Sequence, residues 1–338
     1  MKVLCVTNML PSDATPCAGT FIEQQIEGLR RINIGIEVLL IDRASHGPLE
    51  YVRAGTLVRR AAEQSHCDLV HIMYGGMLAD LATRVLGAIP SVVSFCGVDL
   101  LGANYGSRMF QLRTRLGVWA SHRAARRADA IIVKSRNLER GLPDRVEPHR
   151  VFLVPNGISL ERFRPMDQRD CQASLGWDPE LFHILFSTAN PTNLKKRYSL
   201  AAAAVQLLER RGRRAVLHGM SNIPHPEVPL WINAADVLLF TSRSDEGSPN
   251  IVKESLACNL PVVSVDVGDV AERLMGIDGC YLAEATPADL ADKLELVATG
   301  QRARTARARM EELSIERVAE RLRSIYQRVL DRDLDRAR

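Results

Sequence analysis

The chain repeats one pattern twice: short apolar runs rich in β-branched residues alternate with longer segments that have helical spacing. In the first half the short runs stand at 2–7, 36–41, 68–73, 90–95, 130–134 and 151–154, and the helical segments at 20–31, 53–65, 76–87 and 107–127. Runs of this length bounded by turn residues are typical of buried strands. The alternation predicts an α/β fold, with a parallel sheet covered by helices on both faces.

The second half repeats the alternation after a connection rich in proline and glycine at 155–180. Its strands are expected at 182–188, 215–218, 237–241, 261–265 and near 280, and its helices at 198–211, 230–235, 249–258, 268–275 and throughout the tail 286–333. A length of 338 residues suits two domains of about 150 residues each. We expect two Rossmann-like domains that face each other across a ligand-binding cleft.

Several function classes lack their sequence signatures. No Gly-x-Gly-x-x-Gly follows an early strand, no phosphate-binding Gly-x4-Gly-Lys-Ser/Thr occurs, and no Asp-x-Asp pair ends a strand. The seven cysteines form no Cys-x-x-Cys pair, and the histidines lack metal-ligand spacing, so neither a disulfide framework nor a metal site is expected. No apolar stretch approaches the ~18 residues that suggest a membrane span. These features predict a cytoplasmic protein without a metal or a cofactor.

The net charge of +4 is concentrated in one segment. Residues 101–140 hold nine Lys or Arg against Asp129 and Glu139, which makes the segment +7 and the rest of the chain −3. The helix expected at 107–127 carries many of these arginines, interleaved with apolar and aromatic residues such as Phe110 and Trp119. Such a helix can lie on an anionic membrane surface. The same pattern also fits an ordinary helix whose apolar face belongs to the core.

The segment 236–272 carries the clearest chemistry. A buried strand ends near Thr241, and a polar loop then presents Glu246 and Gly247 before a helix. Ser248 is expected as the N-cap and Pro249 as the first helical residue. The free amides at this helix start then form an anion site at the positive end of the helix dipole.

Glu246 and Glu254 stand at the lip of this helix and one and a half turns inside it. Both carboxylates can line one cavity, and a carboxylate suits the paired hydroxyls of a sugar or a ribose. Taken alone, this spacing favours a reading without function, in which Glu246 is a loop charge and Glu254 a solvated helix residue.

The wider context resembles the nucleotide-sugar site of glycosyltransferase family 4, the retaining glycosyltransferases of group 1. The family's pattern is found here as Ser242, Glu246-Gly247, Glu254, Ala257-Cys258-Asn259-Leu260-Pro261-Val262-Val263 and Gly268. Three further segments are similar to the family: Val154-Pro155-Asn156-Gly157-Ile158 to Pro165, Ala128 to Ser135, and Gly19-Thr20-Phe21. The resemblance covers most of the chain.

This resemblance implies the GT-B architecture. An acceptor-binding domain would occupy residues 1–160 and a nucleotide-sugar-binding domain residues 161–315, with a C-terminal helix at 316–338 that crosses back to the first domain. The implied reaction moves a hexosyl group from a nucleotide-diphosphate sugar to a hydroxyl acceptor with retention of configuration, in the assembly of a surface polysaccharide or a glycolipid. The acceptor would be a saccharide or lipid-linked, and no nucleic acid is expected as a partner.

The resemblance also assigns residue roles. Glu246 would hold sugar hydroxyls, Glu254 the ribose, and Lys196 the diphosphate, so Glu246 and Lys196 are the candidate catalytic residues. The remaining candidate donor-binding residues are Gly19, Arg197, Gly247, Ser248, Pro249 and Asn250, and those on the acceptor side are Thr20, Cys96, Gly97 and Asp99.

Two departures from the family pattern keep alternatives open. Cys96 stands where many members have histidine, and no arginine precedes Lys196 at the usual place near Asn193, so Lys195 or Arg197 is the candidate replacement. One alternative is therefore a non-catalytic relative that binds a nucleotide sugar or partners a transferase. The other is an epimerase of the same fold that acts on the sugar nucleotide itself.

Overall fold

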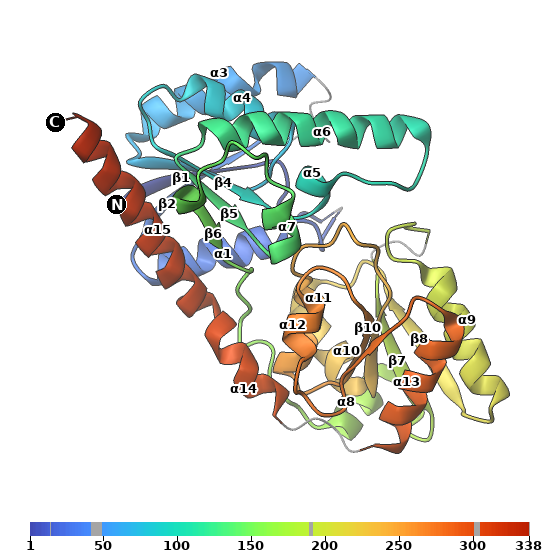
Figure 1. Cartoon of the computed structure of the whole chain (residues 1–338). Coiled ribbons are helices and arrows are strands. Elements are labelled where there is room, and N and C mark those ends of the chain that lie inside the picture. The colour runs from blue at the N-terminus through green and yellow to red at the C-terminus, as the bar shows by residue number, and fades with distance from the viewer. Residues whose placement is uncertain (14, 42–48, 189–191, 301–304, 338) are drawn as a thin grey trace. The chain divides into compact units, whose positions relative to one another are not determined.

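The computed structural model describes residues 1–13, 15–41, 49–188, 192–300 and 305–337. The chain forms two compact units (Figure 1). Unit 1 comprises Met1–Pro11, Ala18–Gly157 and Ile315–Arg338, and unit 2 comprises Ser12–Cys17 and Ile158–Ser314. The units therefore divide at 157/158 and 314/315, where the sequence analysis set the domain boundaries at 160/161 and 315/316.

Unit 1 contains a six-stranded parallel sheet, as the alternating pattern predicts. Its strands in spatial order are β2 (Gly35–Leu40), β1 (Lys2–Thr7), β3 (Leu69–Ile72), β4 (Ser91–Phe95), β5 (Ala130–Val133) and β6 (Val151–Leu153). The inner strands β3, β4 and β5 are buried at every position because both faces of the sheet are covered. In β1, Leu4 and Val6 enter one core, and Val3 and Cys5 enter the core on the opposite face.

Helices cover each face of this sheet. The core on the side of Leu4 includes residues of α3 (Leu49–Ser65), α4 (Met77–Val85) and α6 (Arg108–Arg127). The core on the side of Val3 includes residues of α1 (Thr20–Arg31) and α15 (Ile315–Ala337), which lie side by side in Figure 1. Shorter elements complete unit 1: α5 (Val98–Leu101), α7 (Arg136–Arg140) and the 3₁₀ turn η1 (Pro148–Arg150).

The final helix α15 belongs to unit 1 through close contacts with its core. Gly28 of α1 lets the two helices approach, because a Cβ there would lie 2.9 Å from the carbonyl oxygen of Ile315. The hydroxyl of the fully buried Tyr326 lies 2.6 Å from Nδ1 of His71 on β3, and Nε2 of His71 lies 2.8 Å from Oγ of Ser94. Burial lowers the pKa of His71 to about 3, so this imidazole is neutral at physiological pH.

Unit 2 contains a five-stranded parallel sheet. Its strands in spatial order are β11 (Tyr281–Ala283), β10 (Val262–Val265), β9 (Val237–Phe240), β7 (Phe182–Ser187) and β8 (Ala215–Met220). Its helices are α8 (Gln168–Leu175), α9 (Tyr198–Arg210), α10 (Val228–Ala234), α11 (Asn250–Ala257), α12 (Val270–Leu274), α13 (Pro287–Thr299) and α14 (Ala306–Met310), with 3₁₀ turns η2 (His225–Glu227) and η3 (Glu311–Leu313). One contiguous core supports the sheet. The two parallel α/β units confirm the predicted fold class.

The connection expected at 155–180 is not wholly irregular: it contains the helix α8, and its residues from Ile158 onward are part of unit 2. The side chain of Asp167 caps this helix by accepting from the backbone N–H of Asp170 at 3.0 Å. Gly176 ends it in the left-handed conformation, with φ of 66°. Proline and glycine near both ends of α8 suggest a connecting loop in the sequence, although Asp167 and Gly176 are suitable helix caps.

Candidate active site

Two lysines and a glutamate form a compact ion cluster in unit 2. Nζ of Lys196 lies 2.7 Å from Oε1 of Glu246, and Nζ of Lys195 lies 3.2 Å from Oε2 of the same carboxylate. Lys195 also lies 3.4 Å from the carboxylate of Asp245. The lysines follow β7 and the acids follow β9, which are neighbours in the sheet. The cluster therefore stands at the carboxyl edge of the sheet, where open α/β sheets bind their ligands.

The two lysines determine the charge of Glu246. Its side chain is 12% exposed, and burial alone would raise its pKa. The charges of Lys196 and Lys195, with the hydrogen bond from Lys196, outweigh burial and lower the pKa of Glu246 to about 2. Glu246 is therefore ionised at any physiological pH, and it acts as a hydrogen-bond acceptor.

Backbone contacts hold the lysine loop against the end of β9. Oγ1 of Thr241 donates to the carbonyl oxygen of Lys196 at 2.7 Å, and the N–H of Arg243 donates to that of Lys195 at 3.0 Å. Arg197 donates from Nε to the carbonyl oxygen of Thr241 at 2.5 Å, and from an NH₂ group to that of Ser242 at 2.8 Å. Of the two candidate replacements for the missing arginine, Lys195 joins the ion cluster, and Arg197 braces the loop.

The start of α11 differs from the expected N-cap. The expectation that Ser248 caps the helix is wrong: the N-cap is Pro249, and the hydroxyl of Ser248 donates to Oδ2 of Asp269 at 2.9 Å. The helix proper begins at Asn250, one residue later than predicted. Pro249 is expected inside the helix because proline is common in a helix's first turn. Its ψ of 120° is extended, however, so the helical conformation begins only at the next residue.

A close backbone contact fixes the loop before α11. A Cβ at Gly268 would lie 2.1 Å from the carbonyl oxygen of Gly247, and φ at Gly268 is 62°, so only glycine fits there. The carbonyl oxygen of Gly247 also accepts from the N–H of Asp269 at 3.0 Å. These contacts position the predicted donor-binding residues Gly247 and Ser248 through the neighbouring loop at 268–269.

Glu254 lies inside α11 and is 4% exposed. Its Oε1 is 3.1 Å from Nε2 of His225, whose Nδ1 is in turn 3.0 Å from a guanidinium nitrogen of Arg162. Neither His225 nor Arg162 was a candidate in the sequence analysis. The available signal was weak: a histidine between two prolines, Pro224 and Pro226, in a segment read as a loop. That Glu246 and Glu254 share one cavity stays a prediction.

In unit 1, the predicted acceptor-side residues Cys96, Gly97 and Asp99 lie together after β4. The carboxylate of Asp99 accepts backbone hydrogen bonds from Gly75 at 2.9 Å, Gly97 at 2.7 Å and Cys96 at 3.1 Å. Asp99 is therefore a brace that joins the loops after β3 and β4. Burial, and then the charge of Asp99, raise the pKa of Cys96 to about 12, so its thiol is protonated and is no nucleophile.

Lys134 is a buried lysine that the sequence analysis did not single out. It directly follows β5, is 1% exposed, and interacts electrostatically with Asp99 and Cys96. Its ammonium has no hydrogen-bond partner among the residues that the structure describes. Burial lowers its pKa. A lysine that ends the apolar run 130–133 was the available signal.

Gly19 and Thr20 start α1 in unit 1. Gly19 is the N-cap, with φ of 70°, and a Cβ there would lie 2.6 Å from the carbonyl oxygen of Met9. Thr20 is the first residue of the helix. The glycine is thus required by the tight turn that follows β1, whatever ligand this loop meets.

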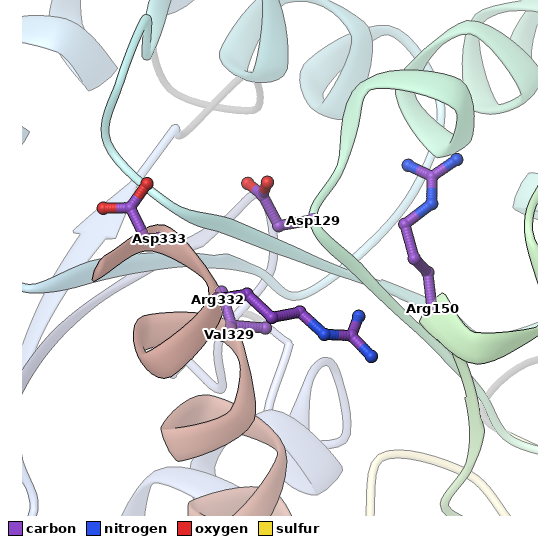
Figure 2. A pocket seen from close by; sticks show the side chains of 5 residues that line it. All are labelled: Asp129, Arg150, Val329, Arg332 and Asp333. Atoms are coloured by element: carbon purple, nitrogen blue, oxygen red, sulfur yellow. The ribbon is translucent and has the colours of Figure 1, made fainter. Parts of the chain in front are cut away.

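Unit 1 also contains a small pocket that is separate from the predicted acceptor-side residues. Asp129, which precedes β5, and Arg150, which precedes β6, line it together with Val329, Arg332 and Asp333 of α15 (Figure 2). It therefore lies at the amino-terminal edge of the sheet, opposite the edge that carries Cys96 and Lys134. Asp129 is engaged there with the backbone N–H of Ser91 at 2.9 Å, and this pocket is not the candidate site.

The helix α6 exposes apolar side chains. Within the described chain, Met109, Leu112, Leu116 and Trp119 are each more than half exposed, and they share one helix face. Of the two readings that the sequence left open, the one in which this apolar face belongs to the core does not hold, because α6 packs through Ala120, Ser121, Ala124 and Ala125. No helix in the described part of the chain is long and apolar enough to cross a membrane. The described ranges also contain no cluster of three or more residues suited to a metal ion.

Two protein-family models match this chain. The model described as "Glycosyl transferase 4-like domain" matches residues 7–157, and the model "Glycosyl transferases group 1" matches residues 191–299. Among curated proteins, a D-inositol 3-phosphate glycosyltransferase of Paenarthrobacter aurescens is 29% identical over 43% of this chain and 42% of its own length. The match thus spans about two fifths of that relative. A putative teichuronic acid biosynthesis glycosyltransferase, TuaC of Bacillus subtilis, is 23% identical over 80% of this chain and 82% of its own.

Solved structures share the fold over nearly the whole chain. Sucrose-phosphate synthase from Thermosynechococcus elongatus matches with a TM-score of 0.78 at 17% identity, over 98% of this chain and 100% of that one. A UDP-GlcNAc 2-epimerase of Methanocaldococcus jannaschii, solved with UDP-GlcNAc and UDP, matches with a TM-score of 0.60 at 11% identity, over 97% and 99%. At these identities the likeness concerns the fold alone.

Proposed function

The chain belongs to the group 1 glycosyltransferases, and we propose that it moves a hexosyl group from a nucleotide-diphosphate sugar to a hydroxyl acceptor with retention of configuration. The observation that carries this proposal is the ion cluster of Lys195, Lys196 and Glu246 beside the start of α11. Two cations and the positive end of a helix dipole favour a diphosphate, and a permanently ionised carboxylate favours sugar hydroxyls.

Each donor-site residue then has a role that follows from its chemistry. Lys196, with Lys195 beside it, meets the diphosphate and stabilises the negative charge that grows as the glycosidic bond breaks. Glu246 accepts hydrogen bonds from the sugar, and Glu254 accepts them from the ribose. The backbone N–H groups of Ser248 and Asn250 contact phosphate oxygens. No metal is needed for this arrangement, because the lysines supply the positive charge.

Retention of configuration does not require a side-chain nucleophile in this mechanism. Glu246 is held between two lysines as an acceptor, and the thiol of Cys96 is protonated at neutral pH. A departing phosphate oxygen would instead receive the proton of the incoming hydroxyl on the same face of the sugar. The protein's part is to position both substrates and to stabilise the leaving group.

The acceptor is proposed to be a saccharide or a lipid-linked saccharide at the cytoplasmic face of a membrane. The exposed apolar face of α6, with exposed Arg113 and Arg115 on the same helix, suits an anionic lipid surface. All seven cysteines are free, which fits a reducing compartment. The proposed pathway is the assembly of a surface polysaccharide or a glycolipid.

A thermal-shift titration with UDP, GDP, ADP, CMP and dTDP tests the donor site. A ligand that binds only the folded protein raises its melting temperature in proportion to RT ln(1 + [L]/Kd). We expect one or two nucleoside diphosphates to shift the wild type and to lose most of this effect in Lys196→Ala. The matched control is Lys293→Ala, because Lys293 pairs with Asp289 on α13 and is remote in sequence from the cluster.

Product analysis then separates this function from its rivals. Transfer to an added acceptor supports the glycosyltransferase, and an isomerised sugar nucleotide formed without acceptor supports an epimerase. Binding without any turnover supports a non-catalytic relative. Equal shifts in melting temperature for the wild type and Lys196→Ala would contradict the proposed donor site.

A further inference from the structure

Three side chains from separate segments of unit 2 form a hydrogen-bonded relay that ends on Glu254. Arg162 lies in the segment after residue 158, His225 in the turn η2, and Glu254 inside α11. The guanidinium of Arg162 is 3.0 Å from Nδ1 of His225, and Nε2 of His225 is 3.1 Å from Oε1 of Glu254. The His225 side chain is 11% exposed and that of Glu254 5%.

The donor at each step of this relay is fixed. A guanidinium has only donors, so Nδ1 of His225 must accept from Arg162 and carries no proton. The proton of the neutral ring is therefore on Nε2, which donates it to Glu254. One tautomer of His225 satisfies both contacts, and the hydrogen bond from Arg162 selects that tautomer.

The relay is itself held in place. The backbone N–H of Arg162 donates to Oγ of Ser159 at 3.2 Å, and the ring of the fully buried Phe163 lies 5.4 Å from the ring of His225. Arg307 donates to the carbonyl oxygen of Phe163 at 2.6 Å. The packed segment 159–163 thus holds Arg162 in place. The hydrogen bond from Arg162 in turn orients the ring of His225.

The two carboxylate oxygens of Glu254 differ in their hydrogen bonding. Oε1 is engaged by His225, and Oε2 makes no hydrogen bond to any other residue that the structure describes. An ionised carboxylate only accepts hydrogen bonds, so the remaining lone pairs suit a ligand that offers hydroxyl donors. The hydrogen bond from His225 restrains rotation of the carboxylate and so limits the directions from which a ligand hydroxyl can donate to it.

We propose that the Arg162–His225–Glu254 relay makes the donor pocket select ribonucleoside diphosphates over their 2′-deoxy counterparts, with His225 as the positioning residue. This inference rests on the proposed function, in which Glu254 meets the ribose. A fixed acceptor aligned with a ribose hydroxyl loses a hydrogen bond when that hydroxyl is missing, and a largely buried carboxylate is then left underpaired. A freely rotating carboxylate would adapt to either sugar. The relay therefore contributes discrimination more than affinity.

The test measures the affinity ratio for two ligands that differ by one hydroxyl. The ligands are the nucleoside diphosphate that shifts the wild type most and its 2′-deoxy form, and calorimetry gives both dissociation constants. We expect the wild type to bind the ribonucleotide about tenfold tighter or better. His225→Leu, which neither donates nor accepts, should reduce the ratio to about threefold or less. His225→Gln, which can accept from Arg162 and donate to Glu254, should keep most of it.

Matched variants separate positioning from general damage. Lys196→Ala should weaken both ligands by a similar factor and keep the ratio, because it removes a diphosphate contact. His149→Leu changes a histidine that is more than half exposed in unit 1 and should change neither constant. If His225→Leu fails to fold, Arg162→Met tests the same relay, since it frees the ring tautomer and should lower the ratio.

The outcomes distinguish failure of the relay from failure of the donor site. A wild type that binds nucleoside diphosphates without distinguishing ribose from deoxyribose overturns the relay but leaves the donor site intact. A ratio that is unchanged in both His225→Leu and Arg162→Met overturns the relay as well. A wild type that binds none of the nucleoside diphosphates overturns the proposed function, and the relay's role falls with it.

Discussion

Nζ of Lys196 lies 2.7 Å from Oε1 of Glu246, so the residue expected to meet the diphosphate and the residue expected to meet the sugar are paired with each other in the ligand-free protein. The pair keeps Glu246 ionised and holds the two side chains against each other at the carboxyl edge of the sheet. A bound diphosphate would therefore find its cation already oriented, which reduces the reorganisation that binding requires.

This pairing predicts a measurable coupling between the two residues. The double-mutant cycle of Glu246→Gln and Lys196→Met should give a coupling free energy of about 1–3 kcal/mol in urea unfolding, because both side chains are largely buried and in direct contact. The pKa of Glu246 is lowered from 4.5 to about 2, so its ionised form stabilises the folded state fully above pH 4.5. The coupling should be constant at neutral pH and decline as the pH falls from 4.5 toward 2. A coupling near zero at pH 7 would refute the pairing.

Glu246→Gln should impair catalysis far more than folding. The amide keeps the shape of the side chain but brings two donors beside Lys195 and Lys196, and it loses the charge that sugar hydroxyls bind. We expect turnover to fall by about 100-fold or more, the size typical of a lost electrostatic contact at a transition state. Far-ultraviolet circular dichroism should be unchanged. Full turnover in this variant would remove Glu246 from the mechanism.

Lys134→Met should make the protein more stable. The ammonium of Lys134 is buried without a hydrogen-bond partner in the described structure, and methionine fills similar space without a charge. Asp99 keeps its backbone donors, so we expect a gain of about 1–3 kcal/mol in the free energy of unfolding near pH 7.5.

The pH dependence of that gain has a definite sign. Burial lowers the pKa of Lys134 below 10.5, so the unfolded chain holds this proton at pH values where the folded protein has released it. The penalty for burying Lys134 therefore shrinks as the pH rises toward 10.5, and so should the advantage of Lys134→Met. Urea unfolding at about pH 7.5 and pH 9.5 checks this. A loss of stability in Lys134→Met would show that the ammonium has a compensating partner.

Much of the fold follows from periodicity, but side-chain pairing does not. The helix 20–31 and the strand 2–7 were predicted with the bounds that the structure has, because an apolar face repeats along the first and a short apolar run marks the second. The helix α8 was missed because its capping residues stand among prolines and glycines. The contact of His225 with Glu254 joins residues 29 positions apart, and no local pattern encodes it.

The resemblance to a family supplied residue types for the site but not their partners. It indicated Lys196 and Glu246 separately, and their mutual contact comes only from the packing of the loop after β7 against the loop after β9. Arg197 illustrates the opposite case. Its charge suggested phosphate binding, yet its guanidinium is directed at the backbone carbonyls of Thr241 and Ser242. Sequence shows which charges are near a site, and tertiary contacts decide which of them are available to a ligand.

The exposed face of α6 predicts binding to anionic vesicles. Leu112, Leu116 and Trp119 present apolar surface, and Arg113 and Arg115 present positive charge on the same helix. Cosedimentation with vesicles that contain phosphatidylglycerol should exceed that with phosphatidylcholine alone, and it should weaken as salt shortens the screening length to about 10 Å at 0.1 M.

Changing the apolar face separates insertion from charge attraction. The variant Leu112→Ser/Leu116→Ser should lower the vesicle affinity by about tenfold, since each leucine contributes apolar area to the lipid contact. Leu296→Ser is the matched control, because Leu296 is 46% exposed on α13 of unit 2 and lies outside the basic segment. Equal binding by the double variant and the wild type would mean that the arginines act alone at the lipid surface. Equal loss in the control would mean that general surface hydrophobicity, and not α6, carries the contact.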